Sequence, residues 1–334
     1  MTDMKNVLIV GTGSIGERHL RCFQSTGRAR LSICETNPDL RRRIAQQYEV
    51  DRVYADLNAA LEDKHDAAVI ATPAQLHIPM ACKLAEAGTH LLIEKPLSTS
   101  LSDVDRLQDL IEKKKIVGSV TYVHRAFPML SAMRQAIHGG RFGRPVQLTV
   151  VAGQHFPTYR PAYRDIYYKD RTTGGGAVQD ALTHMLNSAE WLVGPINRLV
   201  ADASHQVLHG VEVEDTVHVC ARHGDVLASY SLNQYQAPHE ETLTVVCEKG
   251  TARLELHRRR WCWTTAPGQP WEVESQDELS RDAIFVIQAN SFLDAMANRS
   301  EPLCTLGAGL QTLRANLAIL ASVEQGTWQT TGES

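Results

Sequence analysis

The sequence predicts a two-domain α/β protein. A doubly wound Rossmann domain is expected over residues 1–123, and residues 124–334 are expected to form a second domain with mainly antiparallel strands. The chain has 334 residues, more than one hydrophobic core usually supports. Short apolar runs alternate with helical segments up to residue 123, which favours a parallel sheet. After residue 195, strand-like runs follow one another with short turns, which favours antiparallel pairing.

Composition and charge exclude several classes of protein. Hydrophobic residues make up 43% of the chain and charged residues 22%, as in ordinary globular proteins. A formal net charge of -4 argues against general nucleic-acid binding. We see no signal peptide and no apolar run long enough to span a bilayer. The seven cysteines show no CxxC spacing, which predicts reduced thiols in the cytoplasm and no metal site.

The first predicted strand leads into a dinucleotide-binding turn. Residues 5–10 form that strand, and a helix is expected over residues 17–23. The turn between them consists of Gly11, Thr12, Gly13, Ser14, Ile15 and Gly16. Glycines permit a tight turn and close approach of the backbone to a pyrophosphate, which would lie at the helix N-terminus. The strand before and the helix after make this GxGxxG specific.

Glu35 predicts NAD as the cofactor, with NADP less favoured. It follows the next strand, residues 29–34, where a carboxylate accepts from the ribose hydroxyls and repels a 2′-phosphate. Arg41, Arg42 and Arg43 could reach such a phosphate, but we interpret them as a solvated helix face.

Lys95 lies at the ligand-binding edge of the predicted sheet. Strands over residues 67–70 and 89–93 flank a helix over residues 78–87, and Glu94, Lys95 and Pro96 follow the second strand. Ligands of open α/β sheets bind at the carboxyl ends of the strands. A lysine there can exchange protons, although Lys95 taken alone also fits an ordinary solvated lysine. A helix beginning after Ser98 or Ser100 and a strand over residues 117–123 complete this domain.

Asp180 and His184 share one face of a helix in the second domain. Glycines at 174–176 introduce this helix, which is expected over residues 177–193, and an Asp and a His one turn apart can contact each other or one ligand. Residues 154–171 before it are expected to form a loop. The remaining elements are a helix over 129–137, strands over 145–156, 198–208, 216–222, 226–233, 242–248, 251–257 and 261–265, and helices over 283–298 and 308–322.

The segments GTGSIGERH, ATPAQLH and AGTHLLIEKPLS, in this order, resemble the Gfo/Idh/MocA family of glucose–fructose oxidoreductase, inositol dehydrogenase and relatives. The resemblance returns in GGGAVQDALTH and implies that Asp180 and His184 face the nicotinamide. It also implies that the strands of the second domain form a large, mainly antiparallel open sheet, and that a homodimer or homotetramer forms through this sheet. Besides the glycine turn and Glu35, the expected cofactor contacts are Ala71, Thr72, Pro73, His77, Glu94 and Lys95.

We therefore expect an NAD-dependent dehydrogenase or reductase. Hydride would pass between nicotinamide and a secondary alcohol of a sugar, inositol or sugar derivative. His184 is the candidate general base, Asp180 would orient it, and Lys95 would polarise the same oxygen; whether Lys95 or His184 takes the proton stays open. The alternatives are a glycoside-cleaving enzyme that uses bound NAD and a non-catalytic NAD-binding regulator.

The tyrosines and arginines of residues 154–171 suggest a wall of the substrate pocket. Tyrosine rings suit sugar faces, and arginines match carboxylate or phosphate, which extends the hypothesis to an anionic sugar derivative. The alternative is a brace against a neighbouring subunit. The expected substrate contacts are Arg125, His155, Tyr159, Arg160, Tyr163, Arg164, Asp180 and His184.

Overall fold

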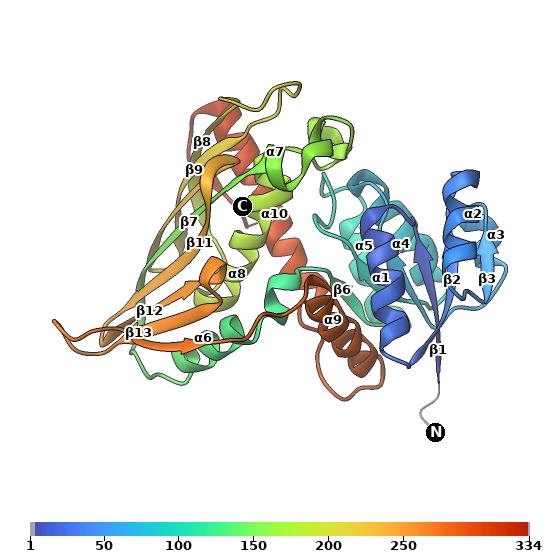
Figure 1. The fold of residues 1–334 in the computed structure, drawn as a ribbon, viewed down its shortest axis with the longest axis horizontal. Helices are drawn as coiled ribbons and strands as arrows, with labels where there is room; N and C mark the ends of the chain where they lie inside the picture. The colour runs from blue at the N-terminus through green and yellow to red at the C-terminus, as the bar shows by residue number, and fades with distance from the viewer. Residues whose placement is uncertain (1–3, 333–334) are drawn as a thin grey trace. The chain divides into compact units, whose positions relative to one another are not determined.

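The structure, a computed structural model, describes residues 4–332 (Figure 1). The chain divides into two compact units: the first contains Met1–Ala126 and Leu279–Gly309, and the second contains Phe127–Glu278 and Leu310–Ser334. The domain boundary expected between residues 123 and 124 lies close to the point between Ala126 and Phe127 where the chain first passes from one unit to the other. The return of a late segment to the first unit was not expected.

The first unit is built on a six-stranded parallel sheet with the order β3-β2-β1-β4-β5-β6. Its strands are β1 Lys5–Val10, β2 Ala29–Cys34, β3 Arg52–Tyr54, β4 Ala67–Ile70, β5 His90–Ile93 and β6 Gly118–Val120. The order reverses between β1 and β4, where doubly wound sheets bind dinucleotides beyond the carboxyl ends of the strands. The predicted Rossmann domain is therefore confirmed.

Six helices belong mainly to this unit: α1 Ser14–Ser25, α2 Pro38–Gln47, α3 Leu57–Leu61, α4 His77–Glu86, α5 Val104–Lys114 and α9 Arg281–Met296. Helix α9 packs beside α1, where the rings of Phe23 and Phe292 meet edge to face and Arg21 forms an ion pair with Asp282. The core of the sheet thus contains side chains from both ends of the chain.

Several boundaries in the first unit differ from the prediction, among them the start of α1, which lies at Ser14 and not at residue 17. Helix α5 begins at Val104, after Asp103 in the left-handed region with a φ of 59°, and not after Ser98 or Ser100. Aspartate tolerates this conformation better than most residues, so the chain can turn there before the helix begins. The last strand covers only Gly118–Val120, because the chain turns into a short 3₁₀ segment at Val123–Ala126.

The second unit is built on a nine-stranded sheet with the order β14-β13-β12-β11-β7-β10-β9-β8-β15. Every pairing is antiparallel except that of β7 with β10. The strands are β7 Pro145–His155, β8 Arg198–Ser204, β9 Thr216–His223, β10 Val226–Asn233, β11 Tyr235–Cys247, β12 Gly250–Glu255, β13 Arg260–Thr264, β14 Glu272–Ser275 and β15 Gln329–Thr330. The mainly antiparallel open sheet is confirmed.

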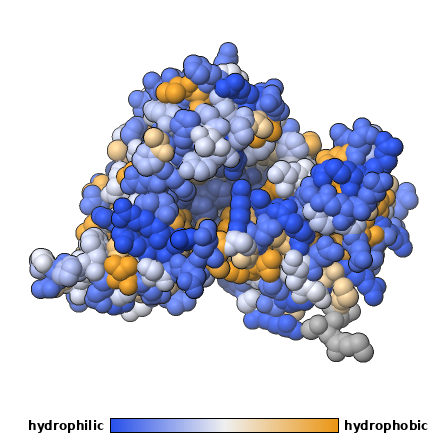
Figure 2. All heavy atoms as spheres, viewed as in Figure 1, coloured by the Kyte–Doolittle hydropathy of each residue, from blue (hydrophilic) through white to orange (hydrophobic). Residues whose placement is uncertain are grey.

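One face of this sheet is covered by α6 Pro128–His138, α8 Thr183–Val193 and most of α10 Leu306–Gln325 (Figure 1). Alternate residues of a strand point to opposite faces, so Leu148, Val150 and Ala152 of β7 are buried on this inner face. The opposite, outer face carries Gln147 and, on β10, Leu227. The surface seen in Figure 2 is mostly hydrophilic, with hydrophobic residues scattered over it.

His223 links two elements inside the second unit. Its Nδ1–H donates to the carbonyl oxygen of Gly194 (2.6 Å), and the hydroxyl of Tyr230 donates to its Nε2 (2.7 Å). Burial lowers the pKa of His223 to about 4, so the imidazole is neutral in the folded protein at pH 7.

We expect acid to weaken this link. Because the folded-state pKa lies below the unfolded value, the stabilisation is complete above about pH 6.5 and is lost as the pH falls toward 4. The free energy of unfolding of the wild type, minus that of His223→Gln, should fall by about 3 kcal/mol between pH 7 and pH 4. Urea titrations of both proteins measure this difference. A difference that does not change with pH would contradict it.

Candidate active site

The glycine turn closes tightly on the end of β4. A Cβ added to Gly11, whose φ is 82°, would lie 2.9 Å from the carbonyl oxygen of Ala71, and one added to Gly16 would lie 1.9 Å from the oxygen of Gly11. Only glycine fits these positions. Helix α1 begins at Ser14 with no side chain capping its N-terminus, which leaves the helix-end N–H groups for an anion.

Glu35 is fixed beside this turn. Its Oε2 accepts from the backbone N–H (2.8 Å) and the hydroxyl (3.1 Å) of Thr12. The arginines after it are engaged within the unit: Arg41 donates to the Glu35 carbonyl oxygen, and the other two pair with acids, Arg42 with Asp39 and Arg43 with Glu17. A carboxylate therefore stands where the adenine ribose would lie. The cradle and this carboxylate fit NAD.

Lys95 follows a buried acid, Glu94. The Nε2–H of His19 donates to Glu94 Oε1 (2.7 Å), and the backbone N–H of Lys95 donates to Glu94 Oε2 (3.0 Å) and to the hydroxyl of Thr121 (3.2 Å). The ring of His19 meets Phe285 of α9 edge to face, with the centroids 5.3 Å apart. Burial alone raises the pKa of Glu94, but the hydrogen bond and charge of His19 and the charge of Lys95 hold it below its ordinary value. Glu94 is thus an ionised anchor for the Lys95 backbone.

Sequence reasoning missed His19 and also His124. Burial and the nearby charge of Lys95 lower the pKa of His124 to about 4, so a neutral imidazole lies close to the lysine at pH 7. The only available signal was position: His19 follows the glycine turn in GERH, and His124 follows the last strand of the sheet.

Two expected contacts in the first unit have other partners. The ring nitrogens of His77 lie 3.1 Å and 2.8 Å from the carbonyl oxygens of Pro96 and Thr72, so its ring joins two loops. Arg125 is buried and donates to the carbonyl oxygen of Leu303 (3.2 Å). These contacts fix both side chains within the first unit, and the cofactor contact of His77 and the substrate contact of Arg125 stay predictions.

In the second unit, the glycine run lets two segments meet the start of the active-site helix. A Cβ on Gly175 would lie 2.2 Å from the oxygen of Tyr168, and one on Gly176 would lie 2.4 Å from Glu214 Oε1. Glu214 is fully buried; it accepts from the backbone N–H of Val178 (3.1 Å) and from Arg171 Nε (2.8 Å). This carboxylate caps the helix start, a role that the sequence did not reveal.

The expected single helix over residues 177–193 is interrupted. Val178–Leu182 forms a π-helical turn, and α8 follows from Thr183. Such turns widen the helix and are frequent at functional sites. Asp180 lies in the widened turn, 2% exposed, and His184 lies in the first turn of α8 and is partly exposed.

Asp180 is held by two side chains of the preceding segment. The hydroxyl of Tyr167 donates to its Oδ1 (2.6 Å), and Arg160 Nη1 lies 3.2 Å from its Oδ2. The charge of Asp180 holds the pKa of Arg160 above its ordinary value, so the pair stays ionised. The carboxylate is therefore oriented before any substrate binds.

Residues 154–171 form short helical turns around a small core of their own, which corrects the expected loop. The turns are Phe156–Tyr159, Pro161–Arg164 and Tyr167–Lys169, and the core consists of Phe156, Tyr163, Tyr168, Leu208, Val211 and Val213. Tyr163 is 1% exposed and donates to the carbonyl oxygen of His209, so its ring offers no face to a sugar. The side chain of Tyr159 is 55% exposed, so its ring has a face that a sugar can contact.

The other predicted contacts of this segment also have partners within the unit. Arg164 Nε donates to the hydroxyl of Tyr163 (3.1 Å), and the ring of His155 hydrogen-bonds to the Thr158 hydroxyl (2.8 Å). With Arg160 on Asp180 and Arg171 on Glu214, two of the arginines already have acidic partners. In the anionic-substrate interpretation the arginines bind a carboxylate or phosphate of the substrate. In the neighbouring-subunit interpretation they pair with acids of another subunit.

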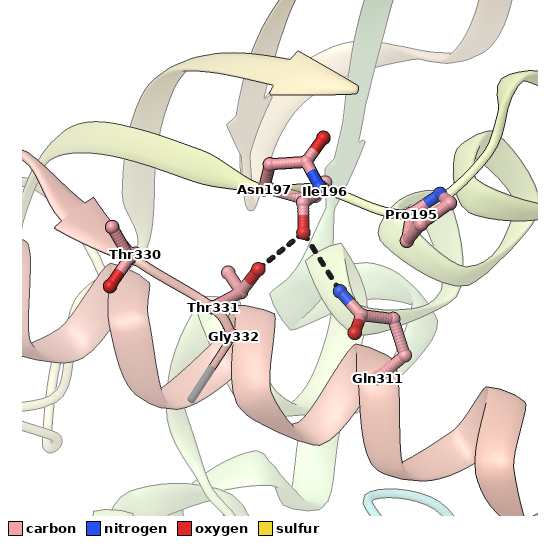
Figure 3. Close-up of a pocket in the computed structure, with 7 residues that line it drawn as sticks. All are labelled: Pro195, Ile196, Asn197, Gln311, Thr330, Thr331 and Gly332. Carbon is pink, nitrogen blue, oxygen red and sulfur yellow. Dashed lines mark hydrogen bonds between the residues drawn. The ribbon is translucent and has the colours of Figure 1, made fainter. Parts of the chain in front are cut away.

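A separate pocket of about 380 Å³ lies elsewhere in the second unit, between the start of β8 and α10 (Figure 3). Gln311 and Thr331 both donate to the carbonyl oxygen of Ile196 at its wall. None of the predicted site residues lines it. Within residues 4–332, no group of three or more His, Cys, Asp or Glu residues is placed to hold a metal ion.

Two family models match this chain. Residues 5–122 match the model "Oxidoreductase family, NAD-binding Rossmann fold", and residues 130–253 match the GFO/IDH/MocA C-terminal domain. Levoglucosan dehydrogenase of Pseudarthrobacter phenanthrenivorans is 27% identical over 206 residues; the match covers 59% of this chain and about half (53%) of that protein.

Two solved structures show the same fold. A levoglucosan dehydrogenase in complex with NADH has a TM-score of 0.91 at 21% identity, covering 99% of this chain and 100% of that one. The WlbA dehydrogenase from Bordetella pertussis, in complex with NADH and UDP-GlcNAcA, has a TM-score of 0.87 at 25% identity, covering 100% of both chains. The predicted fold, oxidoreductase class and NAD cofactor are confirmed. This chain belongs to the Gfo/Idh/MocA family of NAD-binding oxidoreductases.

Proposed function

We propose that this protein is an NAD-dependent dehydrogenase or reductase acting on a secondary alcohol of a sugar, inositol or sugar derivative. The observation that carries the proposal is the buried carboxylate of Asp180, held by Tyr167 and Arg160 one helical turn before His184. A relative named levoglucosan dehydrogenase supports the sugar-like substrate.

Each chemical group has one task in this proposal. NAD, when bound, supplies the hydride acceptor. His184 takes the proton of the hydroxyl group, and the negative charge of Asp180 orients and stabilises the imidazolium that forms. Lys95 stabilises the developing alkoxide charge and is the alternative proton acceptor. Glu94 fixes the backbone from which the Lys95 side chain extends.

The compartment proposed is the cytoplasm. All seven cysteines are free thiols, and all but Cys220 are buried, which fits a reducing environment. No helix of the described residues has the length and apolar character needed to cross a membrane.

Replacing the catalytic groups should reduce turnover without loss of cofactor. Lys95→Ala and His184→Ala should each lower kcat by about a hundredfold, the usual effect of losing one acid–base or electrostatic group. NADH formation with a panel of polyols and sugars gives kcat, and NADH fluorescence gives the Kd of the cofactor. Lys114→Ala, on the exposed face of α5, is the control. Wild-type turnover in Lys95→Ala would remove this lysine from the mechanism.

The preference for NAD should depend on Glu35. NADH should bind at least about tenfold more tightly than NADPH, because a 2′-phosphate would meet the Glu35 carboxylate. Glu35→Gln should reduce this ratio, whereas Asp39→Asn, an exposed acid on α2, should not. Fluorescence titrations with both cofactors measure the ratio. Tighter binding of NADPH by the wild type would shift the determinant to the arginines of α2.

We also propose that the protein is a homodimer or homotetramer formed through the outer face of the nine-stranded sheet. Leu227 is 52% exposed on that face, in the central strand β10. Light scattering should report a dimer or tetramer, and Leu227→Asp should shift it toward smaller species because a charge would be buried at the interface. A wild-type monomer at micromolar concentration would contradict this arrangement.

A further inference from the structure

The inner face of the central strands changes from apolar to polar side chains at one end. Along β7, β10 and β11 the inner positions are apolar and buried: Leu148, Val150, Ala152, Tyr230, Leu232, Leu243 and Val245. The next inner position of each strand is polar: it is Gln154 on β7, Gln234 just after β10 and Glu241 on β11. Because alternate residues share a face, all three polar side chains point to the side covered by α8.

The strand register brings these three residues together. Glu241 pairs with Ala152, and Asn233 pairs with Gly153, so the polar positions lie on three neighbouring strands. A register shift in β11 between Tyr235 and Glu240 interrupts the ladder there. Such irregularities re-aim side chains and are frequent near active sites.

A small polar cleft lies at this point. Its volume is about 40 Å³, and Gln154, Gln234 and Glu241 line it together with Ala181 and Met185. The last two directly follow Asp180 and His184 in the sequence. The ring of His239 at its rim lies 6.0 Å from the ring of the exposed Tyr159. This space accommodates one hydroxyl group or one water molecule, but not a sugar ring.

Gln234 carries a hydrogen-bond donor that the protein leaves unused. Its side chain is 1% exposed, and its Oε1 accepts from the hydroxyl of Tyr168. Its Nε2 makes no hydrogen bond to any residue in the described part of the chain. A buried amide donor without an acceptor costs free energy, so an acceptor from outside the chain is expected beside it.

The charges around the cleft disfavour an anion. Burial raises the pKa of Glu241 to about 8, so its carboxyl group is mostly protonated at pH 7 and can donate a hydrogen bond. The titratable neighbours are His239 and Glu240 on β11 and His257, whose ring contacts the Glu241 backbone. Helix α8 and the π-turn contribute Ala181 and Met185, and β7 contributes Gln154. Arg160, the nearest predicted anion ligand in sequence, is paired with Asp180.

We propose that Gln154, Gln234 and Glu241 form a hydroxyl subsite, which binds one uncharged hydroxyl group of the substrate away from the reacting carbon. The substrate is therefore a neutral polyol or sugar, in place of the anionic derivative suggested by the sequence. This inference rests on the proposed function and deepens it by naming the substrate class.

Equilibrium binding tests the hydroxyl subsite without requiring turnover. Calorimetry on the NADH-loaded protein compares myo-inositol and glucose with glucuronate and glucose 6-phosphate. A neutral compound should bind at least about tenfold more tightly than either anion. Gln154→Leu and Gln234→Leu should each weaken that binding about tenfold by removing a hydrogen bond. Gln135→Leu, the same change at an exposed position of α6, is the matched control.

The pH dependence gives a second readout. Binding of the neutral compound should weaken above about pH 8, as Glu241 ionises and loses its donor, and Glu241→Gln should abolish this dependence. Tighter binding of an anion, or equal effects of Gln154→Leu and Gln135→Leu, would overturn the proposal. If Gln234→Leu fails to fold, the binding measured with Gln154→Leu, at a half-buried position, tests the subsite on its own. A wild-type protein that forms no NADH with any polyol or sugar of the panel would instead refute the proposed function and leave these binding results standing.

Discussion

The second unit depends on close backbone packing at the glycine run. Because Gly175 has no side chain, the backbone of Tyr168 can lie directly against the start of the helix, and the absence of a Cβ at Gly176 leaves room for Glu214. This proximity allows Tyr167 to reach Asp180 with a 2.6 Å hydrogen bond. A larger residue at either glycine would push the tyrosine segment away from the helix, and Asp180 would lose the partner that orients it.

Buried acids form a second constraint, and four of them are compensated locally. Glu94 is matched by His19, Asp180 by Arg160 and Glu214 by Arg171. Asp215 accepts the backbone N–H groups of Gln206, Val207 and Leu208; burial acts to raise its pKa, but these bonds hold it below its ordinary value. Removing one partner would leave a buried charge exposed to an apolar surrounding, which costs far more than the pair contributes. The arginines therefore serve the protein's own carboxylates.

Most of the fold could be predicted because it follows local patterns. The bounds of β1, β2 and β4 follow from apolar runs ended by turn residues. The glycine pattern of Gly11–Gly16 predicts the tight turn that the structure shows there. Contacts between distant residues could not be predicted. Nothing near Glu94 in sequence indicates His19, and nothing near Tyr163 shows that Leu208 and Val211 bury its ring. No periodicity in the sequence indicates the π-turn at Val178–Leu182, because a segment of only five residues fits the spacing of an α-helix as well as that of a π-helix.

The assignment of Leu279–Gly309 to the first unit has a consequence for how the chain folds as it is synthesised. Phe285 and Phe292 of α9 cover His19 and Phe23 of α1, so the nucleotide-binding core is incomplete until these late residues have been made. The ribosome adds roughly 5–20 residues each second, so the early strands wait many seconds for their last helix. During that interval His19 and Phe23 lack their ring contacts with α9, and the second unit, although later in sequence, has most of its sheet before the first unit can close.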